Sequence, residues 1–160
     1  SFGEVDDTDS LRALEIRKVF RDAGIETELS PDPFGVLWEK FIVLSALAGI
    51  TSAAQTRPKE LLKFPDARKL FCDAMEEALA VGLAKGVDLP ANIVQDSLKY
   101  IDSLPDFQNS MQGDYEAGRP TELDALSGAV IRLGKQIGVK TPVHSFFYSV
   151  LLPHKDGRAV

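Results

Sequence analysis

Residues 36–48 read VLWEKFIVLSALA, a stretch that is apolar on nearly every side when it is wound as a helix. A helix of this kind is typical of the centre of a core rather than of a surface. From this stretch to the end of the chain, we find no run with the alternating pattern of a convincing β-strand. We therefore predict that residues 34–152 form an all-α bundle of about five helices.

Two predicted helices follow the first, and each has an apolar face at helical spacing. Residues 65–85 form the clearer of the two, and Gly86 ends them, with Pro90 shortly after. Residues 90–104 form the other helix. The next segment, residues 106–120, contains two glycines and a proline and is predicted to be a loop.

The last two predicted helices have recognisable start signals. Thr121 and Asp124 have the Ser/Thr-x-x-acid spacing of a capping box, which predicts a helix that ends at Gly138. Thr141 is the predicted cap of the final helix. Pro142 follows it in the first turn, where a proline lacks no hydrogen bond that the helix needs.

Residues 1–33 have a different pattern from the rest of the chain. Residues 1–5 and 25–29 are predicted strands, and the helix between them is capped within residues 7–9 and ends at Gly24. A β-α-β unit of this size cannot hold a sheet by itself. We interpret it as the tail of a larger α/β domain. The chain also begins with serine rather than methionine, so we expect a piece of a longer protein.

The composition argues against several classes of protein. The chain has 160 residues, about one domain, with a net charge of −6 and a sequence pI near 4.9. An acidic chain without a Lys/Arg cluster is a poor binder of nucleic acid or anionic membranes. One cysteine and two histidines argue against a disulfide and a metal centre. The longest uncharged stretch, from Phe41 to Arg57, is too short and too polar for a transmembrane helix, so we expect a cytoplasmic protein.

Three polar side chains are candidates for chemistry, and each has a plain structural alternative. Lys40 lies on the apolar helix. It is either a proton donor in a site without water, or a cation whose long side chain reaches the solvent. Glu122, in the first turn of its predicted helix, either points into a cleft or stabilises the helix dipole. Ser110 either presents its hydroxyl to an anion or belongs to a plain loop.

The other polar residues in these segments are given structural roles. Asp114 and Arg119 are close enough in sequence to form a local ion pair. His144 faces away from the apolar stripe of the last helix, which predicts a surface histidine. Cys72 lies on the uncharged side of its helix and is predicted to be a small core residue.

The order and spacing of several short motifs are more specific than any one of them. They are FGE at 2–4, GI at 24–25, WEKF at 38–41, SMQGDYEAGRPTELD at 110–124, GAV at 128–130 and GVKTP at 138–142. Together they resemble the C-terminal helical domain of the ketopantoate reductase (2-dehydropantoate 2-reductase) family, preceded by the closing segment of its N-terminal domain. The resemblance implies a mainly α fold of the 6-phosphogluconate dehydrogenase C-terminal-domain type.

The family reduces the 2-keto acid ketopantoate to pantoate with NADPH, in pantothenate and coenzyme A biosynthesis, and its N-terminal Rossmann domain binds the cofactor. The resemblance implies that Lys40 is the general acid, that Glu122 hydrogen-bonds the substrate and helps to place the lysine, and that Ser110 contacts the substrate carboxylate. The resemblance implies that the chain has three parts. They are a remnant of the nucleotide-binding domain at 1–33, a substrate-binding domain at 34–152 and a frayed tail at 153–160.

Two features depart from the family pattern. Leu44 and Ala48 stand where the family usually has asparagines, which points to a paralogue with a more apolar 2-keto acid. The Gly-x-Gly-x-x-Gly motif that holds the NADPH pyrophosphate is absent, so we expect the chain alone to be inactive. Its open strand edges predict a homodimer. The alternative is a non-catalytic helical module that serves oligomerisation or ligand binding.

Overall fold

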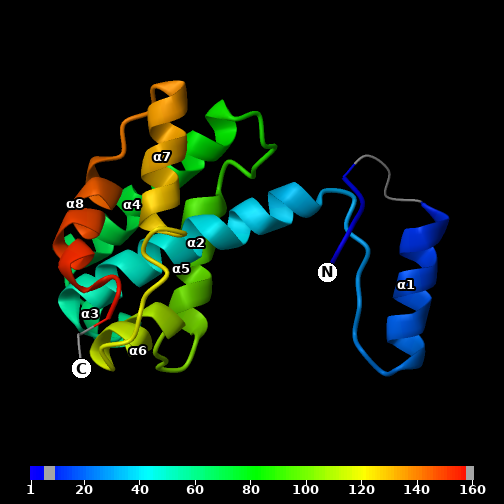
Figure 1. The fold of residues 1–160 in the computed structure, drawn as a ribbon, viewed down its shortest axis with the longest axis horizontal. Coiled ribbons are helices and arrows are strands. Elements are labelled where there is room, and N and C mark those ends of the chain that lie inside the picture. Colours follow the sequence, from blue (N-terminus) through cyan, green and yellow to red (C-terminus); the bar gives the residue numbers. More distant parts are fainter. Residues whose placement is uncertain (6–9, 158–160) are drawn as a thin grey trace. The chain divides into compact units, whose positions relative to one another are not determined.

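The computed structural model describes residues 1–5 and 10–157 of the chain. Two compact units are present, the N-terminal unit Ser1–Lys40 and the helical unit Phe41–Val160. Their boundary falls inside the long helix α2 (Pro33–Ala54), which Figure 1 shows in cyan. Most of the described residues are helical and none of them belongs to a strand longer than a single bridge, so the predicted mainly α fold class is confirmed.

The N-terminal unit contains α1 (Leu11–Asp22) and one short β contact. Ser10 caps α1, because its hydroxyl accepts a hydrogen bond from the backbone N–H of Ala13 at 3.0 Å. The cap predicted at residues 7–9 lies outside the described residues. The helix itself was correctly predicted from its apolar spacing.

The two predicted strands of the N-terminal unit are reduced to one parallel bridge between Phe2 and Leu29. The Phe2 N–H donates to the Glu28 carbonyl at 3.1 Å, and the Ser30 N–H donates to the Phe2 carbonyl at 2.7 Å. The prediction of full strands was therefore wrong for the described residues. A pair of short strands has too few ladder bonds and too little buried surface to extend without neighbours.

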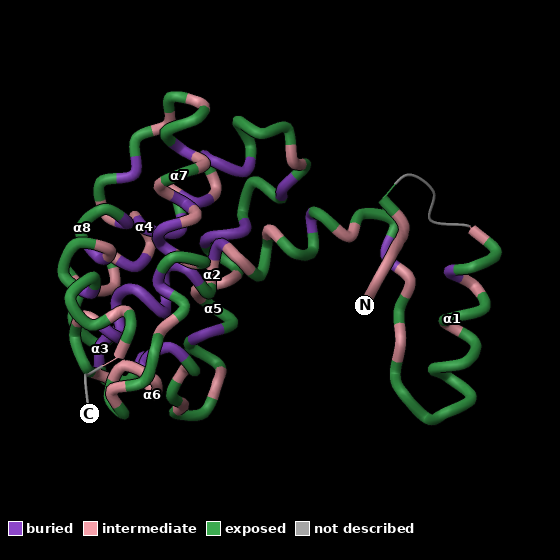
Figure 2. Tube along the Cα trace, viewed as in Figure 1, coloured by how far each residue is buried: buried purple, intermediate pink, exposed green. Residues whose placement is uncertain are grey.

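The helical unit is a bundle in which α4 takes a central place. Its helices after α2 are α3 (Pro58–Leu61), α4 (Pro65–Ala84), α5 (Ile93–Ser103), α6 (Ser110–Glu116), α7 (Ser127–Ile137), α8 (Pro142–Leu151) and the 3₁₀ turn η1 (Leu152–His154). The helix α4 packs against α5, α7 and α8, and Phe71, Met75 and Val81 on it are fully buried. Figure 2 shows the buried residues gathered in this bundle.

The second half of α2 is part of the same core. Every residue from Ser45 to Ser52 is buried, as its nearly all-apolar sequence predicts. Gly49 lets α2 approach α8 closely, because a side-chain carbon at this position would overlap the ring of Phe147.

Two predicted boundaries between residues 106 and 138 were wrong. The predicted loop contains the helix α6, and α7 begins at Ser127 rather than at Thr121. The Thr121 hydroxyl does not cap a helix; it donates to the Lys155 carbonyl at 3.3 Å. A capping box needs the residues after it to be helical, and residues 122–126 form turns instead. Gly138 does end α7, with φ at 77°.

The expected frayed tail is held in place as far as it is described. The Thr121 N–H donates to the Lys155 carbonyl at 2.8 Å, and Pro120 and Asp156 form an isolated antiparallel bridge. Hydrogen bonds of this kind to residues far away in the sequence keep a terminus ordered.

His144 is fully buried, so its prediction as a surface residue was wrong. Its Nε2 lies 3.0 Å from the Ala74 carbonyl and its Nδ1 lies 3.2 Å from the Ser127 hydroxyl. A carbonyl only accepts, so Nε2 carries the proton and Nδ1 accepts from Ser127. Cys72 is half-buried, short of the core position predicted for it, and its burial raises the pKa of its thiol.

The stretch from Phe41 to Arg57 was judged too short and too polar to cross a membrane. The helix α2 that contains most of it begins earlier, at Pro33, and is longer and more apolar. With 22 residues and a mean hydropathy of 1.5, it is the one helix in the described ranges that could cross a membrane by length and composition. Half of that apolar window is buried against the rest of the chain, as in any core helix. Its composition is therefore weak support for a membrane span.

Candidate active site

Lys40 is exposed near the middle of α2 and is the last residue of the N-terminal unit. Its ammonium makes no hydrogen bond or ion pair with the residues that the structure describes. Leu37, one turn before it on the helix, is 62% exposed, and Leu44, one turn after it, is 37% exposed. Among the described residues, Lys40 is thus exposed to solvent, on a helix whose residues one turn to either side of it are apolar.

Ser110 is the first residue of α6, and Asn109 fixes where that helix begins. The Asn109 side-chain oxygen accepts from the Gln112 N–H at 2.9 Å, the bond of an N-cap. Its side-chain nitrogen donates to the Thr51 hydroxyl of α2 at 2.6 Å. Asn109 therefore ties the start of α6, and Ser110 with it, to α2. Asn109 was not predicted from the sequence, although Asn is a favoured N-cap residue.

Glu122 is exposed in the turn that precedes α7. Because α7 begins at Ser127, Glu122 is not in its first turn, and a role in stabilising that helix dipole is ruled out. Its backbone carbonyl accepts from the N–H groups of Ala125 and Leu126, both at 3.0 Å, which fixes the turn. Its carboxylate has no hydrogen-bond or ion-pair partner among the described residues.

The segments that carry Ser110 and Glu122 are anchored on the same apolar cluster. Met111 and Leu123, the residues directly after them, are both buried in it, together with Ala48 of α2 and Leu151 of α8. Tyr115, Leu126 and Tyr148 cover this cluster. The helical unit therefore holds the Ser110 and Glu122 segments beside the same stretch of α2.

Hydrogen bonds stiffen the chain on both sides of Glu122. Asp124 accepts from Lys155 at 2.8 Å and from the Tyr148 hydroxyl at 2.7 Å, and these bonds hold the pKa of Asp124 below its usual value. The predicted pair of Asp114 and Arg119 is confirmed, with its nitrogen and oxygen atoms 2.7 Å apart. The turn of Glu122 is thus fixed by contacts that leave its own carboxylate unused.

Leu44 and Ala48 present no hydrogen-bonding side chain on α2. Ala48 is buried in the apolar cluster, and Leu44 is partly exposed. In the described ranges, no three His, Cys, Asp or Glu side chains lie close enough together to hold a metal ion.

A nicotinamide dinucleotide does not fit the residues present in the N-terminal unit. The sequence before α1, VDDTDSL at residues 5–11, contains no glycine, and among the described residues one bridge between Phe2 and Leu29 stands in place of a parallel sheet. Close approach of a pyrophosphate needs backbone without side chains at that turn.

Most of the chain matches the sequence pattern of one protein family. Residues 34–155 match the family described as "Ketopantoate reductase PanE/ApbA C terminal". The chain belongs to the ketopantoate reductase family. The match includes Lys40, Ser110 and Glu122, and begins one residue after the N-terminus of α2.

Relatives and solved structures of ketopantoate reductases agree with this assignment. A 2-dehydropantoate 2-reductase from Mycobacterium tuberculosis is 30% identical over 146 residues, 91% of this chain and 49% of the relative. The crystal structure of a 2-dehydropantoate 2-reductase from Geobacter metallireducens is 27% identical with a TM-score of 0.85, and covers 94% of this chain and 51% of that one.

The same fold occurs outside the ketopantoate reductases. The structure of a D-mandelate dehydrogenase with NADH is 21% identical, with a TM-score of 0.83 over 96% of this chain and 52% of that one. The chain spans about half the length of the curated relatives that it matches.

Proposed function

We propose that this chain is the substrate-side domain of an NADPH-dependent cytoplasmic enzyme that reduces a 2-keto acid to a 2-hydroxy acid. The first candidate substrate is 2-dehydropantoate, because relatives of this chain are named 2-dehydropantoate 2-reductases. The observation that carries the proposal is the family match over residues 34–155, which includes Lys40, Ser110 and Glu122, and the shared anchoring of the Ser110 and Glu122 segments on the cluster around Ala48 supports it. Because the N-terminal unit does not fit a dinucleotide, the cofactor is held by another part of a longer protein.

Lys40 supplies the proton in this proposal. Hydride addition to a carbonyl carbon leaves negative charge on the oxygen, and a nearby ammonium both stabilises that charge and donates a proton to it. The Lys40 ammonium has no partner among the described residues, so no ion pair must be broken before it acts. The apolar side chains of Leu37 and Leu44 beside it favour a drier surrounding once substrate covers the helix.

Glu122 and Ser110 hold the substrate in this proposal. The Glu122 carboxylate accepts a hydrogen bond from a substrate hydroxyl and attracts the lysine ammonium, and the Ser110 hydroxyl donates to the substrate carboxylate. Both side chains are exposed and unpaired within the described part of the chain, while their neighbours Met111 and Leu123 are buried. Rigid anchors behind free functional groups are what substrate positioning requires.

The identity of the 2-keto acid depends on α2. Leu44 cannot hydrogen-bond a substrate hydroxyl, which favours a substrate with a more apolar side chain than that of ketopantoate. Ketopantoate and a more apolar 2-keto acid are both compatible with this fold, because a D-mandelate dehydrogenase shares it.

NADPH oxidation by the full-length protein tests the proposal, with ketopantoate, 2-oxoisovalerate and phenylglyoxylate as substrates. We expect turnover of at least one of them, and none by the 160-residue chain alone. Leu44→Asn is expected to raise kcat/KM for ketopantoate relative to phenylglyoxylate by about tenfold. Failure of the full-length protein to reduce any of the three would favour the non-catalytic helical module.

A further inference from the structure

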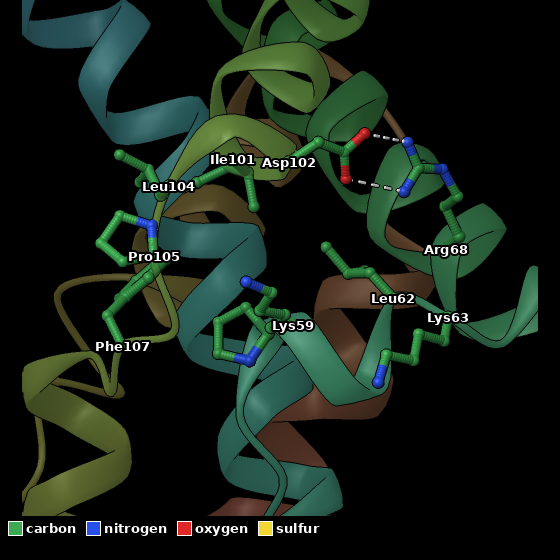
Figure 3. A pocket seen from close by; sticks show the side chains of 10 residues that line it. Lys59, Leu62, Lys63, Arg68, Ile101, Asp102, Leu104, Pro105 and Phe107 are labelled. Atoms are coloured by element: carbon green, nitrogen blue, oxygen red, sulfur yellow. Dashed lines mark hydrogen bonds and ion pairs between the residues drawn. The ribbon is translucent and has the colours of Figure 1, made fainter.

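A cavity of about 160 Å³ lies in the helical unit, and Figure 3 shows the side chains that line it. Its walls come from α3, the first turn of α4, the last turn of α5 and the residues after α5. The lining side chains are Pro58, Lys59, Leu62, Lys63, Arg68, Ile101, Asp102, Leu104, Pro105 and Phe107. None of them belongs to the candidate active site.

The apolar part of the lining can hold a small hydrocarbon group. Leu62 and Ile101 are buried at the base, and Phe107 is half-buried. A cavity of about 150 Å³ with apolar walls is large enough for a benzene ring. The cavity beside α3 is of that size, so it admits one ring or a branched chain of similar bulk.

Three of the four charged residues of the lining already have partners. Arg68 and Asp102 form a two-pronged pair, with one nitrogen–oxygen distance of 2.9 Å, which lowers the pKa of Asp102. The Lys63 ammonium donates to both carboxylate oxygens of Glu60, at 2.7 and 2.9 Å. The charge of each of these two cations is already neutralised by a carboxylate.

Lys59 is the lining cation that has no ion pair or hydrogen bond among the described residues. Figure 3 shows its ammonium directed into the space that the lining side chains enclose. Glu60 and Asp102 neutralise Lys63 and Arg68, so the net charge that a ligand meets in the cavity is the single positive charge of Lys59. The charge pattern therefore favours a single negative charge.

We propose that this cavity binds a small organic monocarboxylate. The carboxylate pairs with Lys59, and the apolar part of the ligand packs against Leu62, Ile101 and Phe107. An exposed ion pair contributes little, and a ligand of this size buries little surface, so we expect a Kd on the order of millimolar.

Titration of the full-length protein with benzoate tests this site, without cofactor or keto acid present. Methyl signals of Leu62 and Ile101 in NMR spectra report on the cavity, and those of Leu44 report on the candidate active site. We expect saturable shifts at Leu62 and Ile101. Benzyl alcohol, which has the same ring without the charge, is expected to bind about fivefold more weakly. Inorganic phosphate is expected to give no saturable shift there.

Lys59→Gln is expected to lower the benzoate affinity at Leu62 and Ile101 to that of benzyl alcohol. The matched control is Lys85→Gln, an exposed lysine at the end of α4 that does not line the cavity. Equal affinity of benzoate for the parent and for Lys59→Gln would overturn the proposal, as would shifts confined to Leu44. The readout does not depend on turnover, so it stands apart from the test of the reductase.

Discussion

At the scale of single residues, two buried or capping side chains were not identified from the sequence. His144 and Asn109 each make both of their hydrogen bonds within the chain, and at least one partner of each is far away in the sequence. Ala74 and Thr51 are the distant partners, and no local pattern reveals them. Lys40, Ser110 and Glu122 stand out in the sequence as candidates, but their proposed roles come from the family resemblance.

The buried His144 predicts a pH dependence of stability. Burial lowers its pKa from 6.5 to about 4. The unfolded chain therefore binds the proton more readily between these values, so stability is full above pH 6.5 and falls as the pH drops toward 4. The loss from this group is about 3 kcal/mol at most. Urea denaturation of the parent and of His144→Gln measures it.

The variant His144→Gln is expected to show a flatter decline of stability over that pH range. His154→Gln is the control, since His154 is exposed. If the parent and His144→Gln lose stability in parallel as the pH falls, the assigned titration of His144 is wrong.

Asn109→Ala is expected to lower the free energy of unfolding by about 1–2 kcal/mol, because it removes the α6 cap and the bond to Thr51. Asn109→Asp keeps the cap oxygen and is expected to lose less. Asn92→Ala is the control, since Asn92 precedes α5 without a side-chain cap bond. Equal losses for Asn109→Ala and Asn92→Ala in urea denaturation would contradict the role given to Asn109.

At the scale of elements, the long periodic helices were predictable and the short ones were not. The helices α2 and α4 follow from their apolar patterns, since α2 is apolar on nearly every side and α4 has one apolar face that is buried. The helix α6 has seven residues, and its start depends on a bond to α2, so the residues around it read as a loop. The turn at 122–126 is fixed by Lys155, a contact that the sequence does not reveal.

The start of α8 depends on α4 rather than on its own cap. Thr141 makes no side-chain cap bond, and the Glu77 carboxylate accepts from the N–H groups of Val143 at 2.7 Å and His144 at 3.0 Å. Burial raises the pKa of Glu77, and these bonds oppose that shift. Glu77→Ala is expected to cost about 2 kcal/mol of stability.

Thermal or urea unfolding checks this prediction, with Glu76→Ala as the matched control on the exposed side of the same helix. A loss for Glu76→Ala as large as that for Glu77→Ala would show that α8 does not depend on the carboxylate of α4.

At the scale of the whole molecule, the N-terminal unit leaves apolar side chains in water. Leu11 is 80% exposed, Val19 63% and Ile25 53%, and α1 has Ala13 as its one buried residue. Exposed apolar surface of this extent is typical of a face that another surface covers. The sequence predicted the helix of this unit, and its two predicted strands are reduced to the bridge between Phe2 and Leu29.

We predict that the 160-residue chain self-associates through the N-terminal unit. Sedimentation velocity is expected to show a dimer whose fraction rises with concentration, and Val19→Glu is expected to reduce that fraction. Arg21→Glu, a change to an already polar position of α1, is expected to have a smaller effect. A monomer at all concentrations would contradict the prediction.

The central claim is that Lys40 donates the proton in the reduction of a 2-keto acid. The most direct measurement is kcat of the full-length protein and of Lys40→Ala with NADPH and its best 2-keto acid, with Lys85→Ala as the control. The account predicts that Lys40→Ala lowers kcat by about 10²–10⁴-fold while Lys85→Ala leaves it unchanged. A Lys40→Ala variant with kcat within about twofold of the parent would contradict it.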